Sequence, residues 1–178
     1  MKKLLIVVDY QNDFVDGALG CPQALQLEKG IAEKIREYRA RGDGAEIIFT
    51  RDTHSRNYME TQEGKDLPVP HCMDAENGWQ HYGEVAGLKA ENDLVFSKPT
   101  FGSLELADYL RNRGSEYESV EFCGVVTNIC VISNIAVVKA AMPDVPQIVN
   151  AALVASNDDS LQEAALKVME SIHVQVIR

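Results

Sequence analysis

The sequence lacks several features that mark common classes of protein. It has no block of lysine or arginine, and its 17 basic and 27 acidic residues give a formal net charge of −10. Because nucleic acids and anionic membranes attract clustered positive charge, we expect neither as a partner. It also lacks an apolar stretch long enough to span a bilayer, an internal repeat, a linker and a low-complexity tract. These absences favour a single globular domain over residues 1–178.

Paired cysteines are also missing, since no C-x-x-C motif occurs in the sequence. The N-terminal apolar run, Leu4–Val8, has only five residues and stops at Asp9 without a small-residue cleavage site, so it does not resemble a signal peptide. Reduced thiols in a cytoplasmic protein are therefore the favoured interpretation. The four cysteines are Cys21, Cys72, Cys123 and Cys130.

Short apolar runs alternate with helical patterns along the chain. The predicted strands are Leu4–Val8, Glu46–Thr50, Asp93–Ser97, Val120–Cys123, Pro146–Asn150 and Val174–Ile177. The predicted helices are Leu27–Arg41, Leu104–Arg113, Thr127–Ala141 and Asp158–Ser171, the last capped by Asn157 or Asp158. This alternation predicts a parallel sheet with helices on both faces. The long segment 51–92 is rich in polar residues, Pro and Gly, and we expect it to be an irregular functional loop.

Reactive side chains follow three of the predicted strands. Asp9 ends the first strand, Lys98 follows the third, and the fourth leads through a glycine turn to Cys130. Taken singly, Asp favours turns, Lys favours solvent and free Cys is commonly buried in a core. Ligands of open parallel sheets bind outside the carboxyl ends of the strands, so all three side chains should meet there. In such a group the carboxylate can accept the thiol proton, the cation can stabilise the thiolate, and the thiolate can attack as a nucleophile.

Cys130 lies in the first turn of the helix predicted from Thr127. The free amides and the dipole at a helix N-terminus favour an anion, so we expect this thiol to ionise more easily than a free one. The same amides are suited to hold the oxyanion of an attacked carbonyl. The segment therefore predicts a nucleophile on a turn from a strand to a helix.

A metal site is indicated within the long loop. Three of the four histidines fall between positions 54 and 81. Asp52 and His54 lie on one side of an extended segment, and His71 follows in a proline-stiffened stretch. Glu60 and Glu63 lie between them, and either completes a mixed nitrogen and oxygen site of the kind that Zn²⁺, Mn²⁺ or Fe²⁺ accepts.

A set of motifs spread over residues 1–140 matches a known family in order. The motifs are Val7–Phe14, Arg51–His54, Pro70–Cys72, Lys98 with Phe101 and Ser103, and Cys123–Val131. Together they resemble the isochorismatase-like cysteine hydrolases and, within that family, the nicotinamidases. The resemblance implies a three-layer α/β/α sandwich with a six-stranded, mainly parallel sheet.

The resemblance also assigns roles to individual residues. It implies a catalytic triad of Asp9, Lys98 and Cys130. It further implies a cis peptide bond between Val125 and Val126, and an oxyanion hole built from the backbone amides of Val126 and Cys130.

The nicotinamidases hold a divalent metal ion, which we expect to be Zn²⁺, with Mn²⁺ or Fe²⁺ as alternatives. The resemblance implies Asp52, His54 and His71 as ligands, with Glu63 preferred over Glu60 as the fourth.

The resemblance implies an aromatic wall for the substrate. It places Phe14 in the substrate pocket, and Trp79 or Phe101 completes that wall unless these rings only pack in the core. The implied reaction is hydrolysis of a linear amide, nicotinamide, to nicotinate and ammonia through a cysteine thioester. The family also suggests a homo-oligomer.

Two other functions stay open at this stage. One is a metal-independent hydrolase of the same family that acts on a carbamoyl or ureido compound. An isochorismate vinyl-ether hydrolase is disfavoured because that branch generally lacks the cysteine. The second is a thiol redox or binding module that uses Cys123 and Cys130, although their separation across a strand and a turn argues against pairing.

Overall fold

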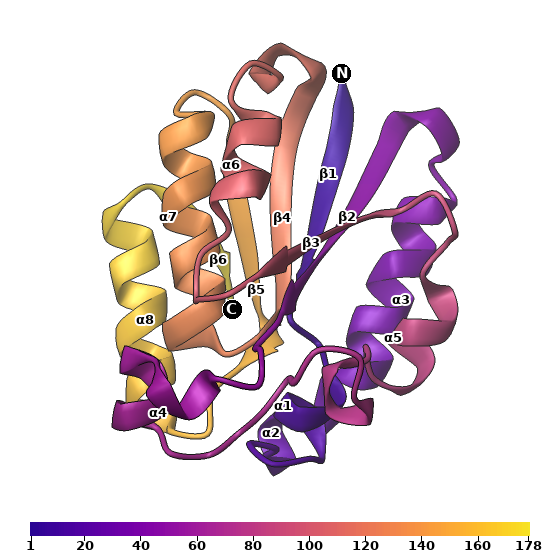
Figure 1. Ribbon diagram of the computed structural model, residues 1–178. Helices are drawn as coiled ribbons and strands as arrows, with labels where there is room; N and C mark the ends of the chain where they lie inside the picture. Colours follow the sequence, from indigo (N-terminus) through magenta and orange to yellow (C-terminus); the bar gives the residue numbers. More distant parts are fainter.

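The computed structural model describes all residues, 1–178, as a six-stranded sheet between two layers of helices (Figure 1). The strands follow the order β3-β2-β1-β4-β5-β6, and every neighbouring pair is parallel. Their bounds are β1 (Lys2–Val8), β2 (Ala45–Asp52), β3 (Leu94–Lys98), β4 (Tyr117–Val125), β5 (Gln147–Ala155) and β6 (Val174–Ile177). The predicted α/β fold with its parallel sheet is confirmed.

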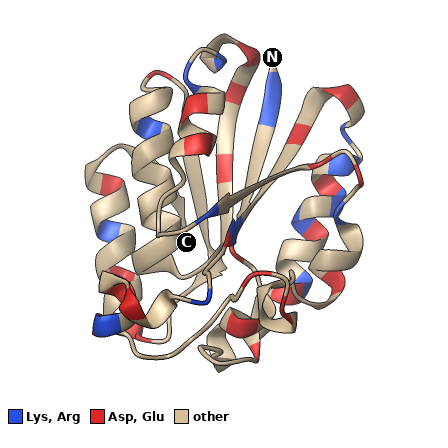
Figure 2. Cartoon of the chain, viewed as in Figure 1, with Lys and Arg blue, Asp and Glu red and all other residues tan.

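Helices cover both faces of this sheet (Figure 1). One layer contains α3 (Glu28–Arg39) and α5 (Gly83–Leu88), and the other contains α6 (Leu104–Leu110), α7 (Ile132–Ala141) and α8 (Asp159–Ser171). No helix combines the length and the apolar character that crossing a membrane would need. Lys and Arg are dispersed over the chain instead of forming a basic face (Figure 2).

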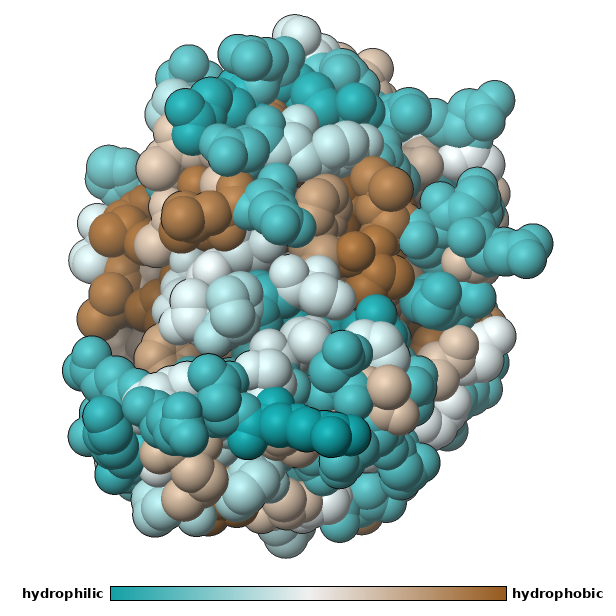
Figure 3. All heavy atoms as spheres, viewed as in Figure 1, coloured by the Kyte–Doolittle hydropathy of each residue, from teal (hydrophilic) through white to brown (hydrophobic).

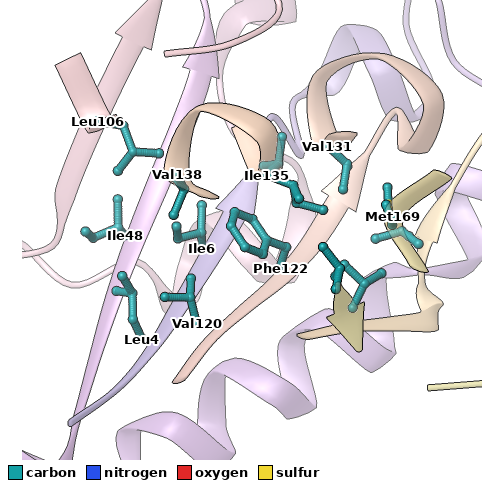
Figure 4. Close-up of a cluster of buried hydrophobic side chains, with 14 of the residues drawn as sticks. Leu4, Ile6, Ile48, Leu106, Val120, Phe122, Val131, Ile135, Val138 and Met169 are labelled. Carbon is teal, nitrogen blue, oxygen red and sulfur yellow. The ribbon is translucent and has the colours of Figure 1, made fainter. Parts of the chain in front are cut away.

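The protein has two hydrophobic cores, one on each face of the sheet, and the central strand β1 contributes side chains to both. Its side chains alternate between the faces of the sheet, and each face is buried under helices, so the strand reads as a continuous apolar run. Leu4 and Ile6 pack in the cluster beneath α6, α7 and α8, which Figure 4 shows with Phe122. Leu5 and Val7 pack in the cluster beneath α3. The surface in Figure 3 is mostly hydrophilic, with apolar side chains in separate patches.

Several predicted boundaries differ from the structure. Strand β4 extends to Val125 and β5 to Ala155, where polar or small residues hid the continuation. The helix predicted from Thr127 begins as a π-helical turn, Thr127–Val131, before α7. Helix α8 begins at Asp159, and the Asp158 side chain caps it by accepting from the amides of residues 160 and 161.

The prediction of an irregular loop over residues 51–92 was wrong in part. This segment contains α4 (Gln62–Asp66) and α5, and Thr61 caps α4 by accepting from the amide of Gly64. Two other short helices, α1 (Asn12–Val15) and α2 (Pro22–Gln26), were also missed. Such short helices offer too few turns for an apolar periodicity to appear. In Figure 1, α1, α2 and α4 gather at the lower end of the sheet, where the strands finish.

Candidate active site

The turn after β4 positions the candidate nucleophile. Gly124 has φ +114°, and a Cβ there would lie 2.0 Å from the carbonyl oxygen of Val8, so only glycine allows β4 to approach β1 this closely. The peptide bond between Val125 and Val126 is cis, as the family resemblance implied. The π-helical turn then places Cys130 with only 4% of its surface exposed.

Asp9, Lys98 and Cys130 converge at the carboxyl ends of β1, β3 and β4. Lys98 Nζ lies 2.6 Å from Asp9 Oδ2 and 3.5 Å from Cys130 Sγ. The Thr50 hydroxyl donates a 2.7 Å hydrogen bond to the other oxygen of Asp9, Oδ1. Asp9 and Lys98 are buried, at 0% and 1% exposure. The structure therefore brings together the three side chains that the strand ends predict.

Burial controls the protonation of this group. It raises the pKa of the Cys130 thiol well above its ordinary value, and the Asp9 carboxylate adds to this effect while Lys98 opposes it. Burial also raises the pKa of Asp9, again against the influence of Lys98. Burial lowers the pKa of Lys98, but Asp9 and Cys130 more than offset it, so the ammonium is retained. The direction of the shift in the Cys130 pKa is therefore opposite to the one expected from the helix N-terminus alone.

Four candidate metal ligands lie beside the triad. Asp52, His54, Glu63 and His71 each offer a ligand atom, and these atoms lie within 4.8 Å of one another. Asp52 Oδ2 is 2.9 Å from His54 Nε2 and 3.4 Å from His71 Nε2. Glu63 Oε1 is 3.7 Å from both ring nitrogens, whereas Glu60 is not part of this group.

The chemistry of these four side chains fits a divalent cation. His71 Nδ1 lies 2.8 Å from the carbonyl oxygen of Val69, which can only accept, so Nδ1 carries the proton and Nε2 presents its lone pair to the cluster. His54 Nε2 is buried without a hydrogen-bond partner of suitable geometry. Two imidazoles and two carboxylates form a donor set that Zn²⁺, Mn²⁺ or Fe²⁺ accepts.

One cavity of about 320 Å³ is lined both by Cys130 of the triad and by members of this cluster. Cys130 and Val126 line it together with Asp52, Glu63 and His71. Its volume is in the range of small-molecule sites. A larger cavity of about 470 Å³ lies at the opposite, amino ends of the strands and contains none of these groups.

Aromatic and aliphatic side chains form the rest of the cavity wall. Phe14 and Phe101 line it, as predicted, but Trp79 does not. The centroid of the Trp79 ring instead lies 3.3 Å from the Arg51 guanidinium carbon, and the Trp79 Nε1 donates to Thr53 Oγ1 at 2.9 Å. The substrate-binding assignment of Trp79 is therefore corrected, because these contacts hold the ring outside the cavity. Sequence reasoning missed the aliphatic lining residues Leu19, Leu67 and Ile129.

Asn134 on α7 is another residue that sequence reasoning missed. Its buried side chain donates to the carbonyl oxygens of Cys130, at 2.8 Å, and Phe101, at 3.0 Å. Its Oδ1 accepts from the amide of Ser103 at 3.1 Å. Asn134 therefore joins the nucleophile turn to the loop that carries the aromatic wall. A polar residue within an apolar helix was the signal available in the sequence.

The four cysteines are all unpaired. Cys123 Sγ contacts the carbonyl oxygen of Ile6 at 3.9 Å and packs in the cluster beneath α3, whereas Cys130 belongs to the cluster beneath α6, α7 and α8. The two side chains therefore lie on different faces of the sheet. This arrangement argues against the thiol-pair alternative.

His81 lies outside the ligand cluster and gives a prediction for stability. It is buried against Phe49, and its Nε2 donates to the Thr50 carbonyl oxygen at 3.3 Å. Burial lowers its pKa from 6.5 to about 4. Between these values the unfolded chain binds more protons, so we expect stability to fall as the pH decreases through this window, by up to about 3 kcal/mol for this group.

Denaturant unfolding of wild type and His81→Gln at pH 7 and pH 4 measures this contribution. The variant should lose less stability than wild type on acidification, while His173→Gln, at an exposed histidine, should lose as much as wild type. Equal losses for wild type and His81→Gln would contradict the assignment.

Comparison with known proteins agrees with this geometry. The family model for the isochorismatase domain matches residues 3–178. The uncharacterized isochorismatase family protein PncA of Bacillus subtilis (strain 168) is 30% identical over 143 residues, which cover 74% of this chain and 75% of that protein. A crystal structure of nicotinamidase/pyrazinamidase PncA from Bacillus subtilis superposes with a TM-score of 0.87 at 28% identity and full coverage of both chains.

A second solved structure is the pyrazinamidase of Pyrococcus horikoshii in complex with zinc. It has a TM-score of 0.83 and 27% identity, and the match covers 100% of this chain and 99% of that one. The chain therefore belongs to the isochorismatase family of hydrolases.

Proposed function

We propose that this protein is a metal-dependent amidohydrolase that converts nicotinamide to nicotinate and ammonia. The observation that carries this proposal is the shared cavity of about 320 Å³, which Cys130 and three of the four candidate metal ligands line together with Phe14 and Phe101. The similarity to solved nicotinamidase and pyrazinamidase structures supports the same substrate class.

The first half of the reaction uses the triad. The carboxylate of Asp9 accepts the thiol proton of Cys130, and the Lys98 ammonium, 3.5 Å from Sγ, stabilises the resulting thiolate. Sulfur forms a bond to the carboxamide carbon, and the carbonyl electron pair moves to oxygen. The backbone amides of Val126 and Cys130 are proposed as donors to this oxyanion.

The second half returns the enzyme to its resting state. When the oxyanion collapses, the carbon–nitrogen bond breaks, and Asp9 gives its proton to the departing nitrogen, which leaves as ammonia. A water molecule then attacks the thioester while Asp9 accepts one of its protons. The carbon–sulfur bond breaks, the proton on Asp9 returns to the Cys130 sulfur, and the product leaves as nicotinic acid, which gives its remaining proton to solvent to become nicotinate. The net reaction consumes one amide and one water.

Recognition of the ring falls to the other side of the cavity. A divalent metal ion bound by Asp52, His54, Glu63 and His71 would supply a Lewis acid for the pyridine nitrogen. Phe14 and Phe101 provide apolar surface for the ring faces, and Leu19, Leu67 and Ile129 exclude water around them.

Ammonia release tests this function directly. We expect hydrolysis of nicotinamide and pyrazinamide, loss of activity after chelation, and recovery with Zn²⁺. His71→Ala should reduce kcat/KM at least about 100-fold and weaken Zn²⁺ binding, because it removes a direct ligand. His173→Gln, which is remote from the cavity, serves as the control. Hydrolysis of an N-carbamoyl amide without metal, and none of nicotinamide, would contradict the proposal and favour the metal-independent alternative.

A further inference from the structure

Gln11 holds the backbone of Asp52 from two sides. Its side chain is fully buried, at 0% exposure. Oε1 accepts a 2.7 Å hydrogen bond from the Asp52 amide, and Nε2 donates a 2.9 Å hydrogen bond to the Asp52 carbonyl oxygen. Nε2 also donates to the Trp79 carbonyl oxygen at 2.9 Å. The side-chain amide thus makes three buried hydrogen bonds, all of them to main-chain groups.

These contacts occur where the sheet itself no longer fixes Asp52 against β1. The parallel register between β1 and β2 runs from Lys3 and Ala45 to Val7 and Phe49, and stops there. Beyond this point the chain at Asp9 turns into the left-handed region, with φ +44°. The Gln11 amide takes the place of a peptide group from β1 and extends the pairing to the end of β2.

Asp52 is the residue through which the triad and the metal ligands meet. Its Oδ1 lies 3.4 Å from Lys98 Nζ, while its Oδ2 faces the ring nitrogens of His54 and His71. A shift of the Asp52 backbone would therefore move one carboxylate relative to both groups. Such shifts matter because catalytic and ligand groups tolerate displacements of only about 0.5 Å.

We propose that Gln11 is a positioning residue that sets the Asp52 carboxylate for metal binding and for its contact with Lys98. This inference deepens the proposed function and rests on it for the identity of Asp52 as a metal ligand. Because its carbonyl oxygen accepts a hydrogen bond from Gln11, Trp79 has a structural role instead of the substrate contact that its ring suggested. Its main chain anchors the loop behind Asp52, while its indole packs elsewhere.

Zn²⁺ affinity, measured by competition with a chromophoric chelator, tests the inference without turnover. Gln11→Met keeps the length of the side chain and removes its hydrogen bonds, and Gln11→Asn keeps the amide but withdraws it by one methylene. We expect both variants to raise the Zn²⁺ dissociation constant about 10- to 100-fold, the usual range for residues that orient a ligand. With Zn²⁺ saturating, kcat for nicotinamide should also fall, because the contact between Asp52 and Lys98 is disturbed.

Gln147→Met is the matched control. Gln147 is equally buried, at 1% exposure on β5, but neither its Nε2 nor its Oε1 has a hydrogen-bond partner. This variant should bind Zn²⁺ within twofold of wild type even if its melting temperature changes. A general effect of losing a buried glutamine would change both sites alike.

The inference is overturned if either Gln11 variant folds and binds Zn²⁺ within twofold of wild type, whatever its melting temperature. Failure of both variants to fold would overturn it too, since Gln11 would then be a determinant of the fold. A wild-type protein that binds Zn²⁺ but releases no ammonia from nicotinamide would refute the proposed function alone.

Discussion

Cys130→Ala is expected to lower kcat for nicotinamide by at least about 10⁴-fold, because Cys130 is the cavity thiol that Lys98 contacts, at 3.5 Å, whereas Cys21, which also lines the cavity, has no such contact. The residual rate would come from binding and from the oxyanion donors. The change removes one sulfur from a buried position, so we expect a loss of only about 1 kcal/mol in the free energy of unfolding. Ammonia release and denaturant unfolding measure the two effects.

Cys123→Ala is the matched control for this prediction. Cys123 is as buried as Cys130 but packs on the other face of the sheet, so the variant should lose a similar amount of stability and keep its turnover. Mass spectrometry of acid-quenched wild type should detect one nicotinoyl group on Cys130. A Cys130→Ala protein that still releases ammonia at a substantial fraction of the wild-type rate would exclude the nucleophile assignment.

The convergence of Asp9, Lys98 and Cys130 could be predicted from sequence because parallel strands impose it. Each residue follows an apolar run, and the carboxyl ends of such runs meet at one edge of the sheet. The long chain segments between these residues do not weaken the argument, since the sheet determines where the strands end. In the structure, Lys98 Nζ contacts both the Asp9 carboxylate and the Cys130 sulfur.

The metal ligands were less accessible to this reasoning. Asp52 follows from the end of β2, but His71 and Glu63 lie on a loop and on the short helix α4, whose positions no periodicity predicts. From residue types alone, Glu60 and Glu63 were equivalent. Only Glu63 belongs to the ligand cluster. It lies on α4, which begins after the Thr61 cap, whereas Glu60 precedes that cap.

Trp79 and the thiol of Cys130 show what sequence cannot supply. A tryptophan in a functional loop can be exposed, pack in the core or line a pocket. For Trp79 the position of the ring is fixed by Arg51, a residue distant in sequence. Burial raises the pKa of the Cys130 thiol, whereas a position at a helix N-terminus alone would lower it. Both outcomes follow from tertiary contacts, whereas the strand ends follow from local patterns.

Lys98→Met is expected to cost about 3–5 kcal/mol of stability, the largest folding effect that we predict. Lys98 is the cation that neutralises the buried carboxylate of Asp9, at a distance of 2.6 Å. Methionine fills a similar volume but leaves this carboxylate without a countercharge. The loss should be greatest near neutral pH and should shrink as the pH falls toward about 4, because Asp9 can then fold in its protonated form.

A double-mutant cycle with Asp9→Asn separates this electrostatic cost from lost packing. Asn keeps an oxygen for the Thr50 hydroxyl and removes the negative charge, so Lys98→Met with Asp9→Asn should be more stable than Lys98→Met alone. Lys167→Met, at an exposed position on α8, should change the free energy of unfolding by no more than about 0.5 kcal/mol. If the double variant is no more stable than Lys98→Met, the cation does not act through Asp9. The contribution of Lys98 to stability would then have to come from its contacts with Cys130 and Asp52.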